Sequence, residues 1–316
     1  MGLFFRSIYL GWFLSLAYAV ILYLSDRYKR ESFTNVGIAF TAGVVATVFI
    51  GLLHNLFPFL QGLGFSGGFG AKVLTSFVRA AIPEELVKLA VFFATAWNFP
   101  REDFSEKYDA ILYMGLIGAG FGAYEDFSYI FSHTFSLIGT ENAEVSNAFQ
   151  FITWQRAFPG HILINAVSGY FLGQAKFTED PGRKWKFIGA SLGVAILAHG
   201  MFNLAASGGG TGWLIIYVLA LGRIFFYLRS ELLQGSPYRL IEEYYRGDNL
   251  YSWEMMSKWK GDYSIETYTE LYKRKESASM GYLPVFISIA VLYPVTISGV
   301  YYLNWLVTKA LSSIIH

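Results

Sequence analysis

The hydrophobic positions of this chain form long, nearly uninterrupted stretches rather than short alternating segments. A membrane-spanning helix needs about 20 consecutive apolar residues, and several stretches reach that length. Eight such helices are predicted, over residues 7–24, 36–60, 73–97, 109–131, 151–174, 187–206, 212–229 and 282–308. The pattern therefore predicts an all-α, polytopic integral membrane protein built as a helical bundle.

The composition agrees with a membrane protein and excludes some chemistry. Hydrophobic residues make up 54% of the chain and charged residues 15%, against about 25% charged residues in soluble domains. The absence of cysteine excludes disulfides, thiolate nucleophiles and cysteine-bound metals. The net charge of +1 says little about partners, and no nucleic acid partner is expected. The first apolar stretch ends in DRYKR rather than in a small-residue cleavage site, which favours a retained span.

Basic residues alternate between the predicted loops. Lys and Arg are concentrated after the first, third, fifth and seventh spans, and the intervening loops carry almost none. The positive-inside rule then places the basic loops in the cytoplasm and both termini outside. We expect a multi-pass protein of the cell membrane, in contact with the lipid bilayer on all sides.

Four regions are predicted along the chain. Residues 1–72 hold the N-terminal transmembrane helices, and 73–229 hold a core bundle with most of the polar residues inside spans. Residues 230–281 form a cytoplasmic segment with one or two amphipathic helices, and 282–316 hold the C-terminal transmembrane helix. The core bundle is therefore the region in which we look for a functional site.

A small set of polar residues lies inside the predicted spans, where charged groups are costly and usually functional. These residues are Glu84, Glu85 and Lys88 in the third span, Glu125 and Asp126 in the fourth, His161 in the fifth, and His199 and Asn203 in the sixth. Glu84, Glu125 and the two histidines lie roughly 9–17 Å from the outer ends of their spans, at 1.5 Å per residue. Similar depths on four helices predict one shared site.

The local spacing supports this interpretation. Glu84 and Lys88 are four residues apart, so they share one helix face. Pro83 has no amide hydrogen, so it is expected to distort the preceding turn and to open room beside Glu84. The stretch GLIGAGFGA before Glu125 is rich in small residues, which allow membrane helices to approach closely.

Groups of this kind suit the activation of water. One carboxylate with two imidazoles is a typical ligand set for a catalytic zinc ion, which makes hydroxide available near neutral pH. A further Glu can act as general base or acid. A paired Glu and His without metal could also activate water on a peptide carbonyl, and the residues leave both possibilities open.

Four motifs in order carry a resemblance to a known family. PEELVK, GFGAYED, GHILINAVSGYFLG and AHGMFN resemble the PrsW family of polytopic intramembrane proteases, which is distantly similar to the CAAX prenyl endopeptidases. The family's EExxK and GFxxxE motifs and its two later histidines match Glu84-Glu85-x-x-Lys88, Gly120-Phe121-x-x-x-Glu125, His161 and His199, within residues 73–206. Asp126 and Ala110 depart from the usual Asn and Gly of the family.

The resemblance implies an endopeptidase that cleaves a membrane-anchored protein near its outer face. The expected substrate is a single-span protein, and in bacterial relatives it is an anti-sigma factor. We expect Glu125, His161 and His199 to bind a divalent metal, with zinc as the expected ion, and Glu84 to act as the base.

Three further residues have expected roles at this site. Glu85 is expected to bind the metal directly or through water, and Lys88 to balance the negative charge. Asn203 is expected to orient a ligand or to polarise the scissile carbonyl.

Other functions are less well supported by the residues. The sequence GFSGG imitates a serine-nucleophile motif but lies in a Gly-rich loop. No HExxH motif is present, and Asp109 and Asp126 lie roughly 25 Å apart along one helix, too far for an aspartyl dyad. The main alternative is an ion- or proton-coupled transporter with a buried Glu/His relay. Internal repeats would favour that alternative, and we find none.

Overall fold

The computed structural model describes residues 2–57, 59, 68–136, 158–208, 210–245 and 264–274, and this part of the chain contains helices and no strand. The all-α prediction is thereby confirmed for the described residues. The N-terminal helices are α1 (Gly2–Leu24) and α2 (Phe33–Leu56). A third helix follows in three pieces, α4 (Phe69–Val73), η1 (Leu74–Ala81) and α5 (Ile82–Ala94), and ends in the short turn η2 (Ala96–Asn98).

Four long helices complete the body of the molecule, and two short helices follow. The long helices are α6 (Lys107–Ser136), α8 (Gly160–Lys176), α9 (Pro181–Gly208) and α10 (Gly210–Gln234). The short helices are α11 (Pro237–Tyr245) and α13 (Ile265–Arg274), both within the predicted cytoplasmic segment. The first seven predicted spans thus each overlap a helix, whereas the eighth, 282–308, and the start of the fifth lie outside the described residues.

Three of the described helices are long and apolar enough to cross a membrane. They are Phe33–Leu56, Pro181–Ser207 and Gly212–Gln234, and Trp12–Leu24 is a shorter apolar helix. The third predicted span is divided at η1, which explains why it does not qualify as one long helix. The count of eight spans and the outer position of both termini stay predictions.

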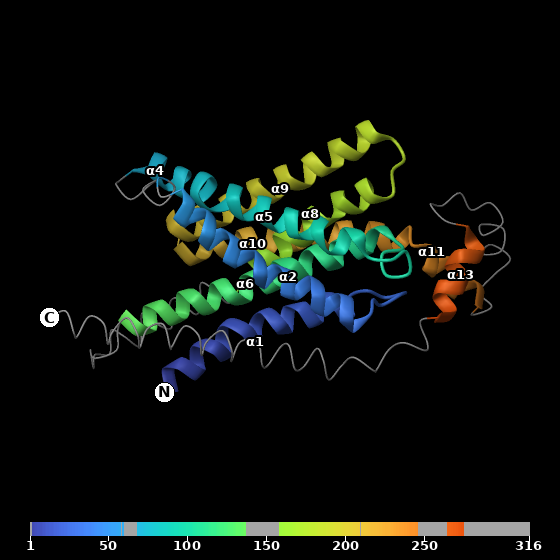
Figure 1. The fold of residues 1–316 in the computed structure, drawn as a ribbon, viewed down its shortest axis with the longest axis horizontal. Coiled ribbons are helices and arrows are strands. Elements are labelled where there is room, and N and C mark those ends of the chain that lie inside the picture. Colours follow the sequence, from blue (N-terminus) through green and yellow to red (C-terminus); the bar gives the residue numbers. More distant parts are fainter. Residues whose placement is uncertain are drawn as a thin grey trace.

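Helix α6 is the centre of the bundle and packs against α1, α2 and α8 (Figure 1). Its glycines account for these close contacts. A Cβ atom at Gly120 would overlap the carbonyl oxygen of Phe40 on α2, and one at Gly118 would overlap the carbonyl oxygen of His161 on α8. The small-residue stretch before Glu125 therefore brings three helices into backbone contact, as its composition predicts.

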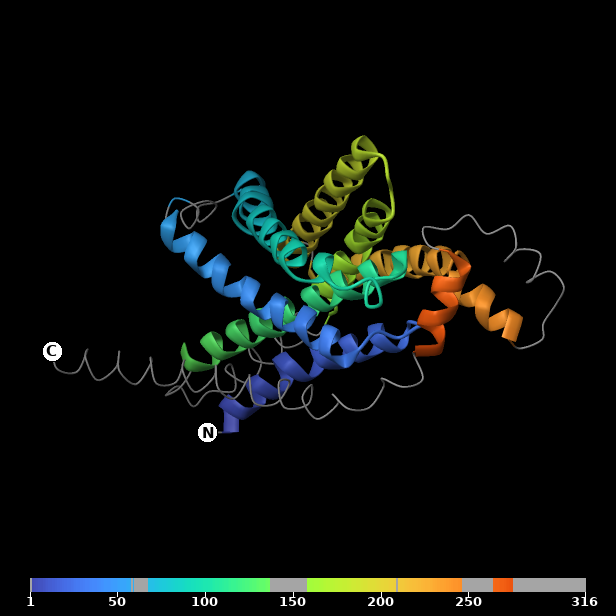
Figure 2. The same ribbon diagram turned by 45° about the vertical axis from the view of Figure 1, so that its right-hand side comes forward.

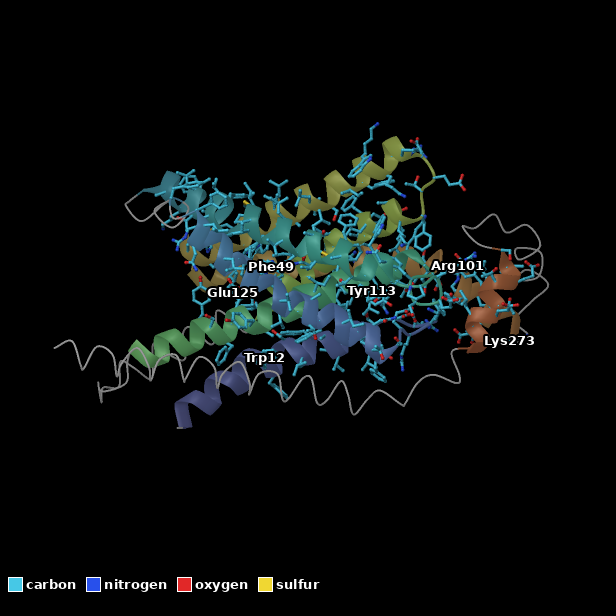
Figure 3. All side chains as sticks on the ribbon, in the orientation of Figure 1. Trp12, Phe49, Arg101, Tyr113, Glu125 and Lys273 are labelled. Carbon is cyan, nitrogen blue, oxygen red and sulfur yellow. The ribbon has the colours of Figure 1, made fainter. Side chains whose placement is uncertain are left out.

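One end of the bundle carries the loops that the sequence marks as basic. Figures 1 and 2 show the loops after α1, α5 and α8 at the same end as α11 and α13. Figure 3 places Arg101 and Lys273 toward this end, with Glu125 on the far side of Tyr113. This arrangement agrees with the alternation of basic loops along the sequence.

A buried polar cluster, here called the loop-end cluster, ties that end together. Nζ of Lys29 lies 2.6 Å from Oε1 of Glu31, and the Tyr113 hydroxyl donates to Oε2 of Glu31 at 2.7 Å. The backbone N–H of Glu106 donates to Oδ2 of Asp109 at 2.9 Å. Burial, together with the negative charge of Asp109, raises the pKa of Glu31 to about 8 even though Lys29 is adjacent.

Candidate intramembrane active site

Glu84 follows directly after a distorted stretch of helix. In η1 the amide of Ile82 donates to the carbonyl of Phe77, five residues earlier, which is the π-helical pattern. Pro83 has no amide hydrogen, so it cannot bond the Arg79 carbonyl four residues before it. The distortion lies where Pro83 predicts it, and such π turns are frequent at functional sites.

Glu85 links two other polar residues. Its Oε1 lies 2.7 Å from Nζ of Lys88 and 2.7 Å from Nδ1 of His199. Glu85, Lys88 and His199 are all buried. The spacing prediction pairs Lys88 with Glu84, but that distance is longer, at 3.7 Å. The closer partner is Glu85, three residues earlier. Residues three and four positions apart lie on the same helix face, so Lys88 can reach either carboxylate.

Lys88 also joins His161 to this group. Its Nζ lies 3.1 Å from Nδ1 of His161 and 3.8 Å from the centroid of the Phe121 ring. The contact with Phe121 is a cation–π interaction, which favours a desolvated ammonium. Phe121 belongs to the GFxxxE motif, so the structure shows a role for that aromatic residue that the spacing of charged residues did not reveal.

His161 completes the link to α6. Its Nε2 lies 2.7 Å from Oε2 of Glu125, and the His161 and His199 rings lie 4.9 Å apart in an edge-on arrangement. Asn165, one turn later, donates to the His161 carbonyl at 2.9 Å and steadies the first turn of α8. Four helices, α5, α6, α8 and α9, thus contribute to one connected cluster, which we call the Glu/His cluster.

The members of the Glu/His cluster are Glu84, Glu85, Lys88, Glu125, His161 and His199. The structure therefore brings together six of the seven residues that are expected from the sequence to have a role at the site. The seventh, Asn203, is half-buried on α9 and forms no hydrogen bond with the residues that the structure describes.

Three side chains of the cluster can hold a metal ion together. One ligand atom each from Glu84, His161 and His199 lies within 4.8 Å of the other two. The sequence selected Glu125 as the carboxylate of this set, whereas the atoms that converge belong to Glu84. Glu125 instead faces Nε2 of His161.

The surroundings of these atoms suit a cation. Oε2 of Glu84 is buried and accepts no hydrogen bond from the described residues. Nε2 of His199 and Nζ of Lys88 both lie 3.7 Å from this oxygen. Two buried carboxylates, Glu84 and Glu85, share the ammonium of Lys88, so a divalent metal would offset the remaining negative charge. Carboxylate and imidazole are also the ligands that zinc accepts in catalytic sites.

The cluster opens onto a cavity of about 650 Å³ between α2, η1 and α6. Glu84 and Glu125 both lie on its wall, and so do His54 of α2 and Arg79 of η1. A molecule in this cavity would therefore meet both carboxylates, and His54 is a wall residue that the sequence analysis did not select.

Comparison with known proteins shows to which family this chain belongs. Residues 31–228 match the sequence profile of the PrsW family intramembrane metalloproteases. The chain belongs to the PrsW family. The match includes all four motifs on which the resemblance depends, and it reaches beyond them into α2 and α10.

Relatives in this family are similar in sequence to this chain over most of their length. The PrsW protease of Clostridioides difficile is 28% identical over 181 residues, covering 56% of this chain and 69% of that protein. The PrsW protease of Bacillus subtilis is also 28% identical over 181 residues, covering 57% and 73% of the two chains. No solved structure matches the chain. As a PrsW protein, this chain is an intramembrane protease with a protein substrate in the membrane.

Proposed function

We propose that this PrsW protein hydrolyses a peptide bond of a single-span membrane protein near the outer face of the membrane, with the Glu/His cluster as its active site. The convergence of Glu84, His161 and His199 within 4.8 Å carries the proposal. Burial of a carboxylate beside two imidazoles is costly, and it is retained where the groups have a function.

Glu84, His161 and His199 would hold a divalent metal, with zinc as the expected ion. On His161 the metal would replace the contact that one ring nitrogen makes with Lys88 or Glu125. Such an ion lowers the pKa of a bound water and so makes hydroxide available at neutral pH. This assignment exchanges the roles of the two carboxylates expected from the sequence. Glu84 becomes the third ligand, because its atoms converge with those of the imidazoles, and Glu125 becomes the proton acceptor.

Glu125 is placed for proton transfer. It lies on the cavity wall with Glu84, and its carboxylate is hydrogen-bonded to Nε2 of His161. In the reaction, the water oxygen bonds to the scissile carbonyl carbon and Glu125 accepts the water proton. Glu125 then returns that proton to the leaving nitrogen as the C–N bond breaks, and the second water proton stays on the new hydroxyl, which leaves a carboxylic acid and an amine as products.

The other members of the cluster hold these groups in place. Glu85 accepts a hydrogen bond from the Nδ1–H group of His199, which directs Nε2 toward Glu84. Lys88 offsets the charge of Glu85. Asn203 lies one turn beyond His199 on α9, and its proposed role is to polarise the scissile carbonyl when substrate is bound.

The experiment is cleavage of single-span substrates by the purified protein in liposomes, including an anti-sigma factor. Wild type is compared with Glu84→Ala, Glu85→Ala and His199→Ala, and new termini are identified by mass spectrometry. We expect cleavage by wild type and loss of cleavage in all three variants. Equal cleavage by the four proteins would remove the Glu/His cluster from the reaction.

A further inference from the structure

The carbonyl of Arg79 receives a hydrogen bond from outside its own helix. Pro83 cannot supply the usual donor, since it lacks an amide hydrogen. Nε2 of His54, on α2, lies 3.3 Å from the Arg79 oxygen. A side chain of a neighbouring helix therefore serves a main-chain acceptor that lies five residues before Glu84.

This acceptor lies at the cavity that leads to the Glu/His cluster. His54, Arg79, Glu84 and Glu125 all line the cavity of about 650 Å³, a size within the range of about 300–1,000 Å³ for ligand pockets. A second cavity touches His161 from the side of α1 and α8, but it measures about 20 Å³, about enough for one water. The larger cavity is the one with room for a peptide.

A peptide in this cavity has a physical need for such an acceptor. The segment around a scissile bond must be extended, so its N–H and C=O groups lose their helical partners. In a membrane every unpaired backbone group is costly. Main-chain bonds to a fixed carbonyl would satisfy one of these groups without regard to the side chains of the substrate.

We propose that an extended segment of the substrate enters between α2 and η1, and that one of its main-chain N–H groups replaces His54 on the Arg79 carbonyl. This inference rests on the proposed function and names the docking point of the same site. Arg79 and Glu84 are five residues apart on the helix, which places the docked N–H about two residues from the scissile bond. His54 is then a positioning residue that keeps the acceptor satisfied until substrate arrives.

Two substitutions test the docking point in opposite directions. Pro83→Ala supplies an internal amide that competes for the Arg79 carbonyl in every turnover, so KM should rise about fivefold, the worth of one hydrogen bond. His54→Leu removes the competitor, so KM should stay the same or fall. Pro181→Ala, at the exposed start of α9, and Leu56→Ala, at the exposed end of α2, are the matched controls and should leave KM unchanged.

A purely structural role for His54 gives a different result. Loss of a helix-bracing contact would lower kcat and thermal stability in His54→Leu without lowering KM, and His54→Gln, which retains a donor, would restore both. That pattern, or an unchanged KM in Pro83→Ala, would overturn the proposal.

The entry route has its own test, because the chain contains no cysteine. Single cysteines are introduced at Val48 and Tyr129 on the cavity wall, and at Leu197 and Leu219, which are exposed on α9 and α10. Each is placed in the Glu84→Gln background and oxidised with a single-span substrate that carries one cysteine near its cleavage site. We expect crosslinks from Val48 and Tyr129 and none from the α9 and α10 positions.

The outcomes separate this inference from the proposed function. If cleavage by the wild-type protein does not depend on Glu84, the proposed function is contradicted, whatever the crosslinks show. Glu84-dependent cleavage with crosslinks from α9 or α10 would leave the function standing and overturn the route. If a lipid acyl chain fills the cavity, Val48 and Tyr129 will form no crosslinks to the substrate, and this result would also overturn the entry route.

Discussion

Oε1 of Glu85 lies 2.7 Å from Nδ1 of His199 and at the same distance from Nζ of Lys88, so one carboxylate oxygen serves both a ring nitrogen and an ammonium. The bond to Nδ1 fixes the His199 ring with Nε2 3.7 Å from Oε2 of Glu84. An imidazole held in this way by a carboxylate is a common arrangement behind metal ligands. We therefore expect Glu85 to act through His199 rather than on the substrate.

A positioning role for Glu85 predicts a defect that added metal can repair. Glu85→Gln should lower metal affinity or activity roughly 10- to 100-fold, because the amide holds the His199 ring less firmly than a carboxylate does. Activity is measured across a zinc titration, beside Glu266→Gln in the exposed part of α13 as control. Saturating zinc should restore most of the activity of Glu85→Gln, and full activity at limiting zinc would contradict the role.

Glu84 should behave differently, because it is placed among the proposed ligands. Glu84→Gln should lose at least about 10²-fold in kcat and should not recover at any zinc concentration, since a neutral amide neither balances the cation nor ligates it well. Bound metal is measured on the same samples by elemental analysis. A variant that retains its metal and its kcat would exclude Glu84 from the site.

Lys88 is expected to matter for stability as well as for activity. Lys88→Met leaves Glu84 and Glu85 buried without their ammonium, and breaking a buried ion pair costs about 3–5 kcal/mol. Thermal unfolding of the metal-free protein in detergent should show a clear fall in Tm. The double variant with Glu85→Gln should recover part of that loss, whereas simple additivity would show that the two side chains are not coupled.

Removal of metal should affect folding and cleavage together. A chelator should abolish cleavage and lower Tm, because a ligand at 100 times its Kd stabilises the folded state by about 2.7 kcal/mol. Zinc added back should restore both quantities in wild type and neither in His199→Ala. Full cleavage in excess chelator would instead support the metal-free Glu–His mechanism.

The loop-end cluster predicts a dependence of stability on pH. Burial raises the pKa of Glu31 from its ordinary value of 4.5 to about 8, so the folded protein binds a proton that the unfolded chain has lost. The contribution of Glu31 to stability should therefore be greatest below about pH 4.5 and decline by roughly 2–3 kcal/mol between pH 6 and 8.

A neutral substitution checks the source of this decline. Burial and the charge of Asp109 also raise the pKa of Glu106, so Glu31→Gln should reduce the slope of stability against pH without removing it. Thermal unfolding at several pH values measures the slope, with Glu266→Gln as the control that retains it. A slope equal to that of wild type would show that Glu31 titrates normally.

Patterns within one helix could be predicted from the sequence. Contacts between helices could be predicted only in part. Equal depth indicated that Glu84, Glu125, His161 and His199 meet, since membrane helices run nearly parallel. Depth does not give the rotation of a helix about its axis. That rotation brings Glu84 together with both imidazoles, whereas Glu125 faces that of His161, and it makes Glu85 the closer partner of Lys88.

Two other features of the structure could not be predicted from a single sequence. His54 lies at the end of an apolar helix, and its bond to the Arg79 carbonyl joins residues 25 positions apart. The meeting of Lys29 and Glu31 with Asp109 depends on how the loop after α1 folds back onto α6. Hydrophobic periodicity describes helices and does not describe such loops.

The glycine contacts of α6 determine which wall of the cavity can move. Gly120 meets the backbone of Phe40, and Gly43 on α2 meets the backbone of Ile117, so α2 and α6 are fastened main chain to main chain. η1 meets α9 through the ring of Phe77 against Gly200, a contact with a side chain that can rotate. Because η1 continues directly into α5, which bears Glu84, any movement of η1 that admits a peptide would also move Glu84 relative to His161 and His199.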